Sequence, residues 1–367
     1  MPVDLSPLFT PLQLGSLQLP NRFVMAPMTR EFSPEGIPGA DVAAYYARRA
    51  AGKVGLIITE GTYIDHAAAG DSIDVPRFYG EQALAGWQAV ADVVHAVGGR
   101  IVPQLWHRGA QRPPGSGPHP RADSISPSGS YPGESDSQPM SLSVIEEVVA
   151  SYARAAADAQ RLGFDGIELH GAHGYLLDQF LWSGTNLRSD IYGGGPAERA
   201  RFAAEVVAAC RAATSVDFPI IFRLSNWKAG DYHARLAQTP HELEALLTPL
   251  VAAGVDIFHA STRRHFEPAF PHSPLGLAGW VKKITTKPTI TVGGVGLDGD
   301  LMTAYTEGGR ARTVPLDQLL HQFTDEQFDL VAVGRALLSD PAWVLKIHQG
   351  RFDDLRTFDA ADRLKLA

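Results

Sequence analysis

Short apolar runs separated by stretches of helical periodicity recur along almost the whole chain. The apolar runs lie at residues 23–27, 55–60, 100–105, 166–170, 220–224, 257–260, 289–292 and 330–333, and the clearest helical stretches lie at 83–97, 144–162, 197–213 and 241–253. Near-continuous apolar runs are typical of strands buried on both faces, and helices between such strands predict a parallel sheet. The eight units predict an α/β fold, a closed (β/α)8 barrel known as the TIM barrel.

The length of the chain and the composition of its loops are compatible with one domain. We expect residues 1–367 to form a single barrel domain with long βα loops. Residues 111–140 contain seven Pro, four Gly and seven Ser, which predict a long loop on the active face, either a lid or a passive surface loop. Residues 305–327 form an extra segment between the seventh and eighth strands, and the sequence leaves its role open.

The composition argues against nucleic-acid and membrane partners. The formal charge is −8 and no run of Lys or Arg could follow a nucleic-acid backbone. Pro2, Pro7 and Pro11 interrupt the N-terminal apolar residues, so we expect no secretion signal, and no apolar stretch approaches the length of a membrane-spanning helix. The single Cys210 can form neither an internal disulfide nor an iron–sulfur cluster. We therefore expect a cytoplasmic protein.

Glycines and an arginine follow the last two predicted strands. Gly293 and Gly294 come after 289–292, and Gly334 and Arg335 come after 330–333. Glycines let the backbone approach a phosphate closely, and barrels commonly bind phosphate in these two loops. The alternative is that the glycines only turn the chain and Arg335 is a surface charge.

The densest group of reactive side chains follows the fourth predicted strand, in the segment Glu168-Leu-His170-Gly-Ala-His173-Gly-Tyr175. Two neutral imidazoles can donate hydrogen bonds to one substrate oxygen, and a tyrosine that is protonated at neutral pH can deliver a proton to carbon. Addition of hydride to a polarised double bond requires both. A second interpretation is a metal-dependent barrel hydrolase with His170 and His173 as ligands, although no complete set of ligand spacings appears.

We expect Arg223 to end the fifth strand, inside the apolar segment Ile-Ile-Phe-Arg-Leu. A buried arginine is costly unless an anion pairs with it. The residues alone leave two partners open: a ligand with a delocalised negative charge, or a structural ion pair with Glu168.

A series of segments in this chain resembles the flavin-dependent old yellow enzyme (ene-reductase) family. The resemblance runs from about residue 8 to residue 350, and its order along the chain makes it far more specific than any single motif. The segments are Leu8-Phe9, Asn21-Arg22-Phe-Val-Met-Ala-Pro27-Met-Thr29-Arg30, Thr59-Glu60-Gly61, Gln104-Leu-Trp106, His170-Gly-Ala-His173-Gly-Tyr175-Leu-Leu-Asp178, Asn186-Leu-Arg188-Ser-Asp190-Ile-Tyr192 and Gly334-Arg335.

The resemblance implies non-covalent FMN at the barrel mouth and NAD(P)H as co-substrate. It implies that Pro27, Met28 and Thr29 line the flavin ring, that Gly61 and Gln104 hold its pyrimidine edge, that Arg223 lies near N1 and O2, and that Gly293, Gly294, Gly334 and Arg335 hold the phosphate. It places His170, His173, Tyr175 and Trp106 in the substrate pocket, with Tyr175 as proton donor. The implied substrate is an activated alkene, reduced in a ping-pong reaction, and the implied assembly is a monomer or homodimer.

The chain departs from the family pattern at several places. Ile191 stands where the family usually has Glu, residues 195–199 replace a usual Gly-Ser-x-x-Asn-Arg run, and residues 357–367 lack the usual aromatic-rich tail. These departures leave open how the pocket rim is built and whether the tail takes part in a dimer contact. A flavoprotein that mainly binds phenols without physiological turnover is a further hypothesis beside the ene-reductase and the metal hydrolase.

Overall fold

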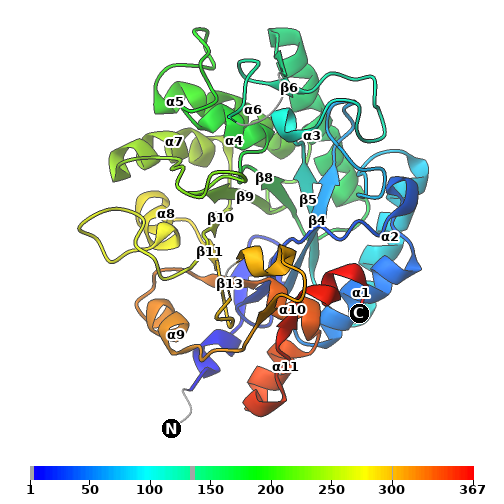
Figure 1. Cartoon of the computed structure of the whole chain (residues 1–367), viewed down its shortest axis with the longest axis vertical. Coiled ribbons are helices and arrows are strands. Elements are labelled where there is room, and N and C mark those ends of the chain that lie inside the picture. The colour runs from blue at the N-terminus through cyan, green and yellow to red at the C-terminus, as the bar shows by residue number, and fades with distance from the viewer. Residues whose placement is uncertain (1–3, 133–136, 300) are drawn as a thin grey trace.

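The computed structural model describes residues 4–132, 137–299 and 301–367. Eight parallel strands close into a barrel, and β13 pairs with β3 to join the last strand to the first (Figure 1). The strands are β3 (Phe23–Met25), β4 (Leu56–Tyr63), β5 (Ile101–Trp106), β8 (Ile167–His170), β9 (Ile220–Ser225), β10 (Ile257–Ser261), β11 (Thr289–Val292) and β13 (Leu330–Val333). Each strand overlaps one predicted apolar run, so the predicted TIM barrel is confirmed.

Helices surround the barrel in Figure 1. They are α1 (Ala40–Ala51), α2 (Glu81–Ala96), α3 (Leu142–Arg161), α4 (Leu176–Leu181), α5 (Pro196–Arg199), α6 (Arg201–Ala212), α7 (Pro240–Ala253), α8 (Leu277–Thr285), α9 (Asp317–Thr324), α10 (Arg335–Ser339) and α11 (Trp343–His348). Val148, Tyr152, Ala155 and Ala159 lie on the buried face of α3. Ser141 caps this helix by accepting a hydrogen bond from the backbone N–H of Val144 at 3.3 Å. None of the helices in the described ranges is long and apolar enough to cross a membrane.

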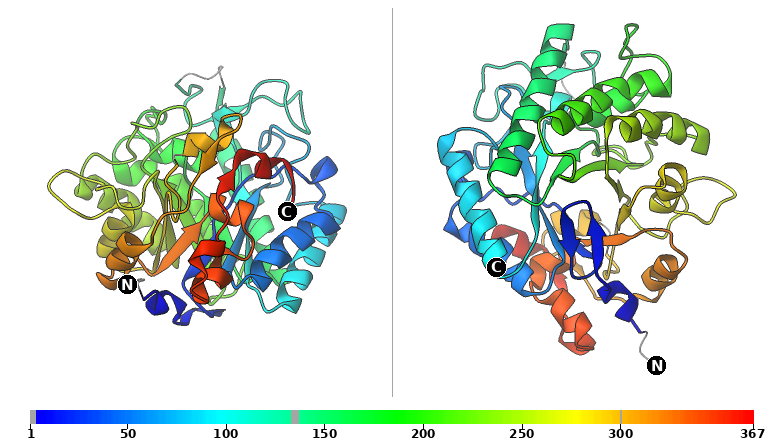
Figure 2. Two further views of the ribbon diagram at one scale, coloured as in Figure 1. Left: turned by 60° about the horizontal axis from the view of Figure 1, so that its bottom comes forward. Right: turned by 180° about the vertical axis from the view of Figure 1, so that it is seen from behind.

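The barrel interior is filled by aliphatic side chains, among them Val24, Ile58, Val102, Ile221, Ile290 and Leu330. An antiparallel hairpin of β1 (Leu12–Leu14) and β2 (Leu17–Leu19) adds Leu17 and Leu19 to this cluster. The right view of Figure 2, which shows the molecule from behind, has this hairpin in front of the barrel. It covers the N-terminal ends of the strands, so the opposite mouth is the end at which ligands can enter.

The long loop predicted at 111–140 contains two short paired strands, β6 (Ile125–Ser126) and β7 (Gln138–Pro139). Residues 133–136 of this loop lie outside the described residues. None of its described residues lines the central cavity, so the proposed lid role stays a prediction. The short helices η1 (Ser6–Phe9), η2 (Pro34–Gly36) and η3 (Gly109–Gln111) complete the N-terminal half.

The extra segment between the seventh and eighth barrel strands begins earlier than the predicted residue 305. It contains η4 (Leu301–Tyr305), β12 (Arg310–Ala311) and α9, and β12 pairs with β14 (Phe358–Asp359) near the C-terminus. The chain ends with η5 (Phe352–Asp354) and η6 (Ala360–Leu364). The first turn, η4, lies in front of the barrel mouth in Figure 1, and the sequence missed it because five residues carry no periodic pattern.

Candidate active site

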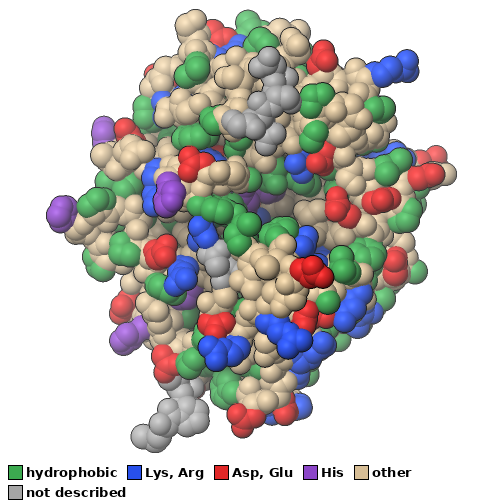
Figure 3. All heavy atoms as spheres, in the orientation of Figure 1, with side chains coloured by type: hydrophobic (Ala, Val, Ile, Leu, Met, Phe, Trp, Pro, Cys, Tyr) green, Lys and Arg blue, Asp and Glu red, His purple; other side chains and the backbone are tan. Residues whose placement is uncertain are grey.

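A cavity of about 630 Å³ opens at the C-terminal mouth of the barrel. Figure 3 shows a hollow at the centre of this face. Every residue that the sequence proposes for the site lines this one cavity: Pro27, Met28, Thr29, Gly61, Gln104, Trp106, His170, His173, Tyr175, Arg223, Gly293, Gly294, Gly334 and Arg335. The barrel therefore brings together side chains from all parts of the chain.

His170, His173 and Tyr175 form one wall of the cavity. His170 is the last residue of β8, and Tyr175 precedes the first turn of α4. His173 adopts φ of 62°, a left-handed conformation that is uncommon for histidine, and its backbone N–H donates to the Ser225 hydroxyl at 2.9 Å. Its ring stacks on Trp227 with 4.2 Å between ring centroids. One contact thus holds the backbone of His173 and the other holds its ring.

A buried ion pair supports this wall from behind. Lys228 Nζ lies 2.7 Å from both carboxylate oxygens of Asp178, and neither side chain is exposed to solvent. Asp178 Oδ2 also accepts a hydrogen bond from the backbone N–H of Gly174 at 2.6 Å. The sequence analysis did not single out Lys228, because it lies in a polar loop after β9 and nothing in the pattern indicates burial.

The electrostatics of the wall favour hydrogen-bond donation by neutral groups. Burial, assisted by the nearby Arg223 cation, holds the pKa of His170 and of His173 well below the usual range for histidine. Burial also raises the pKa of Tyr175, which is therefore protonated at neutral pH. The wall can bind an electron-rich oxygen and offer one proton.

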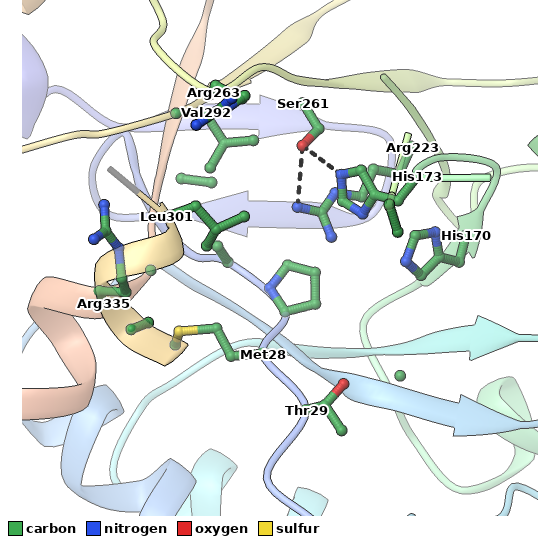
Figure 4. Close-up of a pocket in the computed structure, with 18 of the residues that line it drawn as sticks. Met28, Thr29, His170, His173, Arg223, Ser261, Arg263, Val292, Leu301 and Arg335 are labelled. Atoms are coloured by element: carbon green, nitrogen blue, oxygen red, sulfur yellow. Dashed lines mark hydrogen bonds between the residues drawn. The ribbon is translucent and has the colours of Figure 1, made fainter. Parts of the chain in front are cut away.

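Arg223 lies within β9, two residues before its end, and lines the cavity, and only 6% of it is exposed. One of its terminal nitrogens lies 3.5 Å from the Ser261 hydroxyl, which also hydrogen-bonds His173 Nε2 at 2.8 Å (Figure 4). Its Nε has no hydrogen-bond partner among the described residues. Burial lowers the pKa of Arg223, so a resident anion would relieve the cost of this charge.

Glu168 is engaged elsewhere and does not form the alternative ion pair with Arg223. Its two carboxylate oxygens lie 2.6 Å from His259 Nδ1 and 2.7 Å from Gln104 Nε2. Gln104 lines the cavity. Glu168 still contributes to the field at Arg223, where its charge favours the protonated guanidinium.

The loops after β11 and β13 form an open cradle. Gly293 and Gly294 have φ of 148° and 64°, a region that favours glycine. A Cβ at Gly294 would meet only the Arg263 carbonyl oxygen at 3.5 Å, and a Cβ at Gly334 would first meet Met28 Sδ, also at 3.5 Å. The guanidinium of Arg335 donates to the Gly299 carbonyl oxygen at 2.6 Å. The space beside Gly294 and Gly334 therefore faces the cavity, whereas a Cβ at Gly293 would meet the Thr262 carbonyl oxygen at 2.5 Å.

The rim of the cavity comes from residues that the sequence analysis did not assign to the site. Trp227 and Tyr232 lie in the loop after β9, Tyr305 ends η4, and Arg363 lies in η6. The guanidinium of Arg363 lies over the Tyr305 ring at 4.2 Å from its centroid. The C-terminal segment thus reaches the pocket although it lacks the expected aromatic-rich tail.

The described residues do not form a metal site. Within residues 4–132, 137–299 and 301–367, no group of three or more His, Cys, Asp or Glu side chains could hold a metal ion. Another histidine of the barrel, His259, is bonded to Glu168. The metal-dependent hydrolase has no support from this geometry.

Comparisons with known proteins agree with the fold. Residues 7–354 match the model of the NADH:flavin oxidoreductase / NADH oxidase family. The chain is 34% identical to an NADH oxidase of Thermoanaerobacter brockii over 95% of the chain and 52% of that protein. It is 41% identical to 12-oxophytodienoate reductase 7 of Oryza sativa subsp. japonica over 58% of the chain and 57% of that protein. The chain thus spans about half the length of these curated relatives.

The structure of morphinone reductase in complex with tetrahydroNAD superposes with a TM-score of 0.78 at 30% identity, over 94% of this chain and 90% of that one.

Proposed function

Because the chain belongs to the NADH:flavin oxidoreductase / NADH oxidase family, we propose that it reduces the C=C bond of α,β-unsaturated carbonyl or nitro compounds with NAD(P)H and FMN. The observation that carries this proposal is the cluster of His170, His173 and Tyr175 on one wall of the cavity that Arg223 also lines. The two substrates use this cavity in turn, in a ping-pong reaction.

The residues present fit FMN. Arg223 supplies a buried cation whose Nε has no partner among the described residues, and the glycine cradle leaves room for a phosphate. The residues that would hold the cofactor are Pro27, Met28 and Thr29 along the ring, Gly61 and Gln104 at its pyrimidine edge, Arg223 at N1 and O2, and Gly293, Gly294, Gly334 and Arg335 at the phosphate. When bound, FMN supplies the hydride chemistry, accepting a hydride from NAD(P)H and releasing it to the alkene.

His170 and His173 bind the oxygen of the substrate. As neutral imidazoles they donate hydrogen bonds without bringing a net charge, and the bonds strengthen as negative charge develops on that oxygen. The stacking of His173 on Trp227 and its contact with Ser261 hold its ring in one orientation. This polarisation makes the β-carbon of the substrate electrophilic.

Tyr175 provides the proton for the α-carbon. Its ring is 4.8 Å from His170 and 4.9 Å from Trp106, centroid to centroid, with both rings close to perpendicular to it. No group in the described part of the chain hydrogen-bonds its hydroxyl, so the proton is available to a substrate. Its raised pKa keeps that proton in place at neutral pH.

A visible absorption spectrum of the purified protein tests this function. We expect flavin bands that bleach when NADPH is added under nitrogen and return when 2-cyclohexenone follows, whereas cyclohexanone, the saturated control, leaves the flavin reduced. Bleaching without recovery on any activated alkene would favour a phenol-binding flavoprotein. A colourless protein that cannot take up FMN would overturn the proposal.

A further inference from the structure

One wall of the cavity carries a cation beside the proton donor. The guanidinium carbon of Arg108 lies 5.7 Å from the centroid of the Tyr175 ring and 5.4 Å from that of Trp106. Trp106 and Tyr175 touch edge to face. Arg108 lines the same cavity as these two rings.

Arg108 is held in place by its own contacts. Its Nη1 lies 3.0 Å from Asp71 Oδ2, and its Nη2 and Nε donate to the Gln111 carbonyl oxygen at 2.8 and 3.2 Å. Asp71 in turn accepts a hydrogen bond from the Tyr63 hydroxyl at 2.8 Å. The side chains of Arg108 and Asp71 are 20% and 21% exposed, so water screens their charges only in part.

We propose that Arg108 tunes proton donation by Tyr175, and that Asp71 limits how much of the Arg108 charge reaches the tyrosine. Arg108 is a positioning residue in this inference, because it acts through Tyr175 and not on the substrate. The inference rests on the proposed function, in which Tyr175 is the proton donor.

The proton transfer creates the charge on which Arg108 acts. The O–H bond of Tyr175 breaks as a C–H bond forms at the α-carbon, and the electron pair of the O–H bond stays on the phenolate oxygen. The β-carbon gains the hydride of the proposed reaction, and water then returns a proton to the phenolate. A fixed cation nearby stabilises the phenolate more than the phenol and therefore favours the transfer.

The charged and titratable groups around Tyr175 act in opposite directions. Burial raises the pKa of Tyr175, Arg108 lowers it more than any other charged neighbour, Asp71 raises it, and Arg223 lowers it slightly. Tyr305 of η4 raises it and the neighbouring His170 is neutral. Removing Arg108 and removing the Asp71 charge should therefore shift the titration of Tyr175 in opposite directions.

Three variants of the FMN-loaded enzyme test the inference: Arg108→Met, Arg108→Lys and Asp71→Asn. The first removes the charge, the second keeps it, and the third leaves the charge without its counterion. The first readout needs no turnover: the ring carbon resonances of 13C-labelled tyrosine are titrated, and Tyr175 is identified by the signal that Tyr175→Phe lacks. We expect the Tyr175 titration to move up by about one pH unit in Arg108→Met, down in Asp71→Asn, and little in Arg108→Lys.

The second readout is the rate at which the reduced enzyme is reoxidised by 2-cyclohexenone, measured by stopped flow from pH 6 to pH 10. We expect Arg108→Met to slow this step about three- to tenfold more than it slows reduction by NADPH, and Arg108→Lys to restore most of the rate. If Arg108 had only a structural role, all three variants would be slower. The Tyr175 titration would then not move in opposite directions in Arg108→Met and Asp71→Asn.

The outcomes separate this inference from the proposed function. Equal shifts of the same sign in Arg108→Met and Asp71→Asn, or no shift in either, would overturn the role of Arg108 while leaving Tyr175 as donor. If Tyr175→Phe itself fails to slow reoxidation, the donor assignment falls and the role of Arg108 falls with it. If Arg108→Met does not fold, the other two variants test the inference. A downward shift of the Tyr175 titration in Asp71→Asn with little shift in Arg108→Lys would support it, and any other pattern would overturn it.

Discussion

Lys228 and Asp178 form a fully buried ion pair in which the ammonium nitrogen is 2.7 Å from each carboxylate oxygen. The pair joins the loop after β9 to α4. Its Asp178 carboxylate accepts a hydrogen bond from the backbone N–H of Gly174, the residue between His173 and Tyr175. The backbone N–H of Ala229 also donates to the His173 carbonyl oxygen at 3.1 Å, so the two loops are held together at successive residues.

Breaking this pair from one side should be strongly destabilising. Lys228→Met leaves the Asp178 carboxylate buried without a counterion, and we expect the free energy of unfolding to fall by about 3–5 kcal/mol in a urea titration. Lys228→Met combined with Asp178→Asn should cost less than the two single losses added together. The exposed pair Arg161–Asp158 is the control, since Arg161→Met should change stability by only about 0–1 kcal/mol. Similar losses at both pairs would contradict the buried role.

Tyr175→Phe separates the two halves of the proposed reaction. The ring and its packing on Trp106 remain, but the proton for the α-carbon is lost, so we expect alkene reduction to slow by about 10²–10⁴-fold. Reduction of the enzyme by NAD(P)H should stay nearly intact, because that step needs no proton from tyrosine. Stopped-flow measurement of each half-reaction gives the comparison, and an equal loss in both would rule out the donor role.

The two active-site histidines should govern ligand affinity. Each neutral hydrogen bond contributes about 0.5–1.5 kcal/mol, so His170→Ala with His173→Ala should weaken binding of a phenol roughly 10- to 100-fold. A spectral titration of the oxidised enzyme with p-chlorophenol measures this. His241, whose side chain is 91% exposed, provides a matched histidine control, and His241→Ala should bind the phenol normally. Unchanged affinity in the double variant would argue against the assignment.

Arg223→Met should separate cofactor affinity from folding. Methionine keeps the apolar stem and removes a charge that is costly to bury, so the protein without FMN should be at least as stable to heat as the parent. FMN binding, followed by quenching of flavin fluorescence, should weaken by about 10- to 100-fold because a charged hydrogen bond is lost. Arg223→Lys keeps the charge and should bind FMN better than Arg223→Met does. Normal FMN binding by Arg223→Met would remove this residue from the cofactor site.

The buried His107 should make stability depend on pH. Its Nδ1 accepts from the backbone N–H of Gly109 at 3.0 Å, so Nε2 carries the proton toward His66 Nδ1, also at 3.0 Å. Burial holds the pKa of His107 well below its usual range in the folded protein. The unfolded chain binds the extra proton first, so the stability that this neutral histidine contributes is complete above about pH 6.5 and declines as the pH falls below that value.

His107→Asn tests that dependence, since asparagine keeps an acceptor for Gly109 and does not titrate. Between pH 6 and pH 5, the free energy of unfolding of the parent should fall more steeply than that of the variant, by up to about 1.4 kcal/mol per pH unit. If the parent and the variant lose stability equally as the pH falls, the pKa of His107 is not lowered by folding and the prediction is wrong.

The barrel could be predicted from the sequence because its strands are buried on both faces. The run predicted at 166–170 is β8 (Ile167–His170), and the run at 100–105 is β5 (Ile101–Trp106). The run at 55–60 was too short, because β4 continues to Tyr63 through an irregularity in its pairing with β5 between Ile58 and Gly61. The predicted site residues met in one cavity because residues at the C-terminal ends of barrel strands converge whatever their separation in the chain.

The remaining features depend on contacts between loops, which no local pattern encodes. Lys228 and Asp178 are 50 residues apart. In the sequence Lys228 looks like an ordinary solvent-exposed lysine, because only the contact of the loop after β9 with α4 buries it. The contact of Arg108 with Asp71 likewise joins the loops after two neighbouring strands, and only the folded barrel brings the guanidinium to Tyr175.

The two segments that complete the rim, η4 and η6, contribute no barrel strand. Arg363 of η6 donates to the Ala304 carbonyl oxygen of η4 at 2.9 Å, so the segments support each other above the mouth. The histidines and Tyr175, by contrast, are attached to β8 and α4. Under the proposed function, the reacting groups and the rim therefore belong to separable parts of the polypeptide, and grafting a different rim onto this barrel offers a way to change which substrates enter without altering the proposed reacting groups.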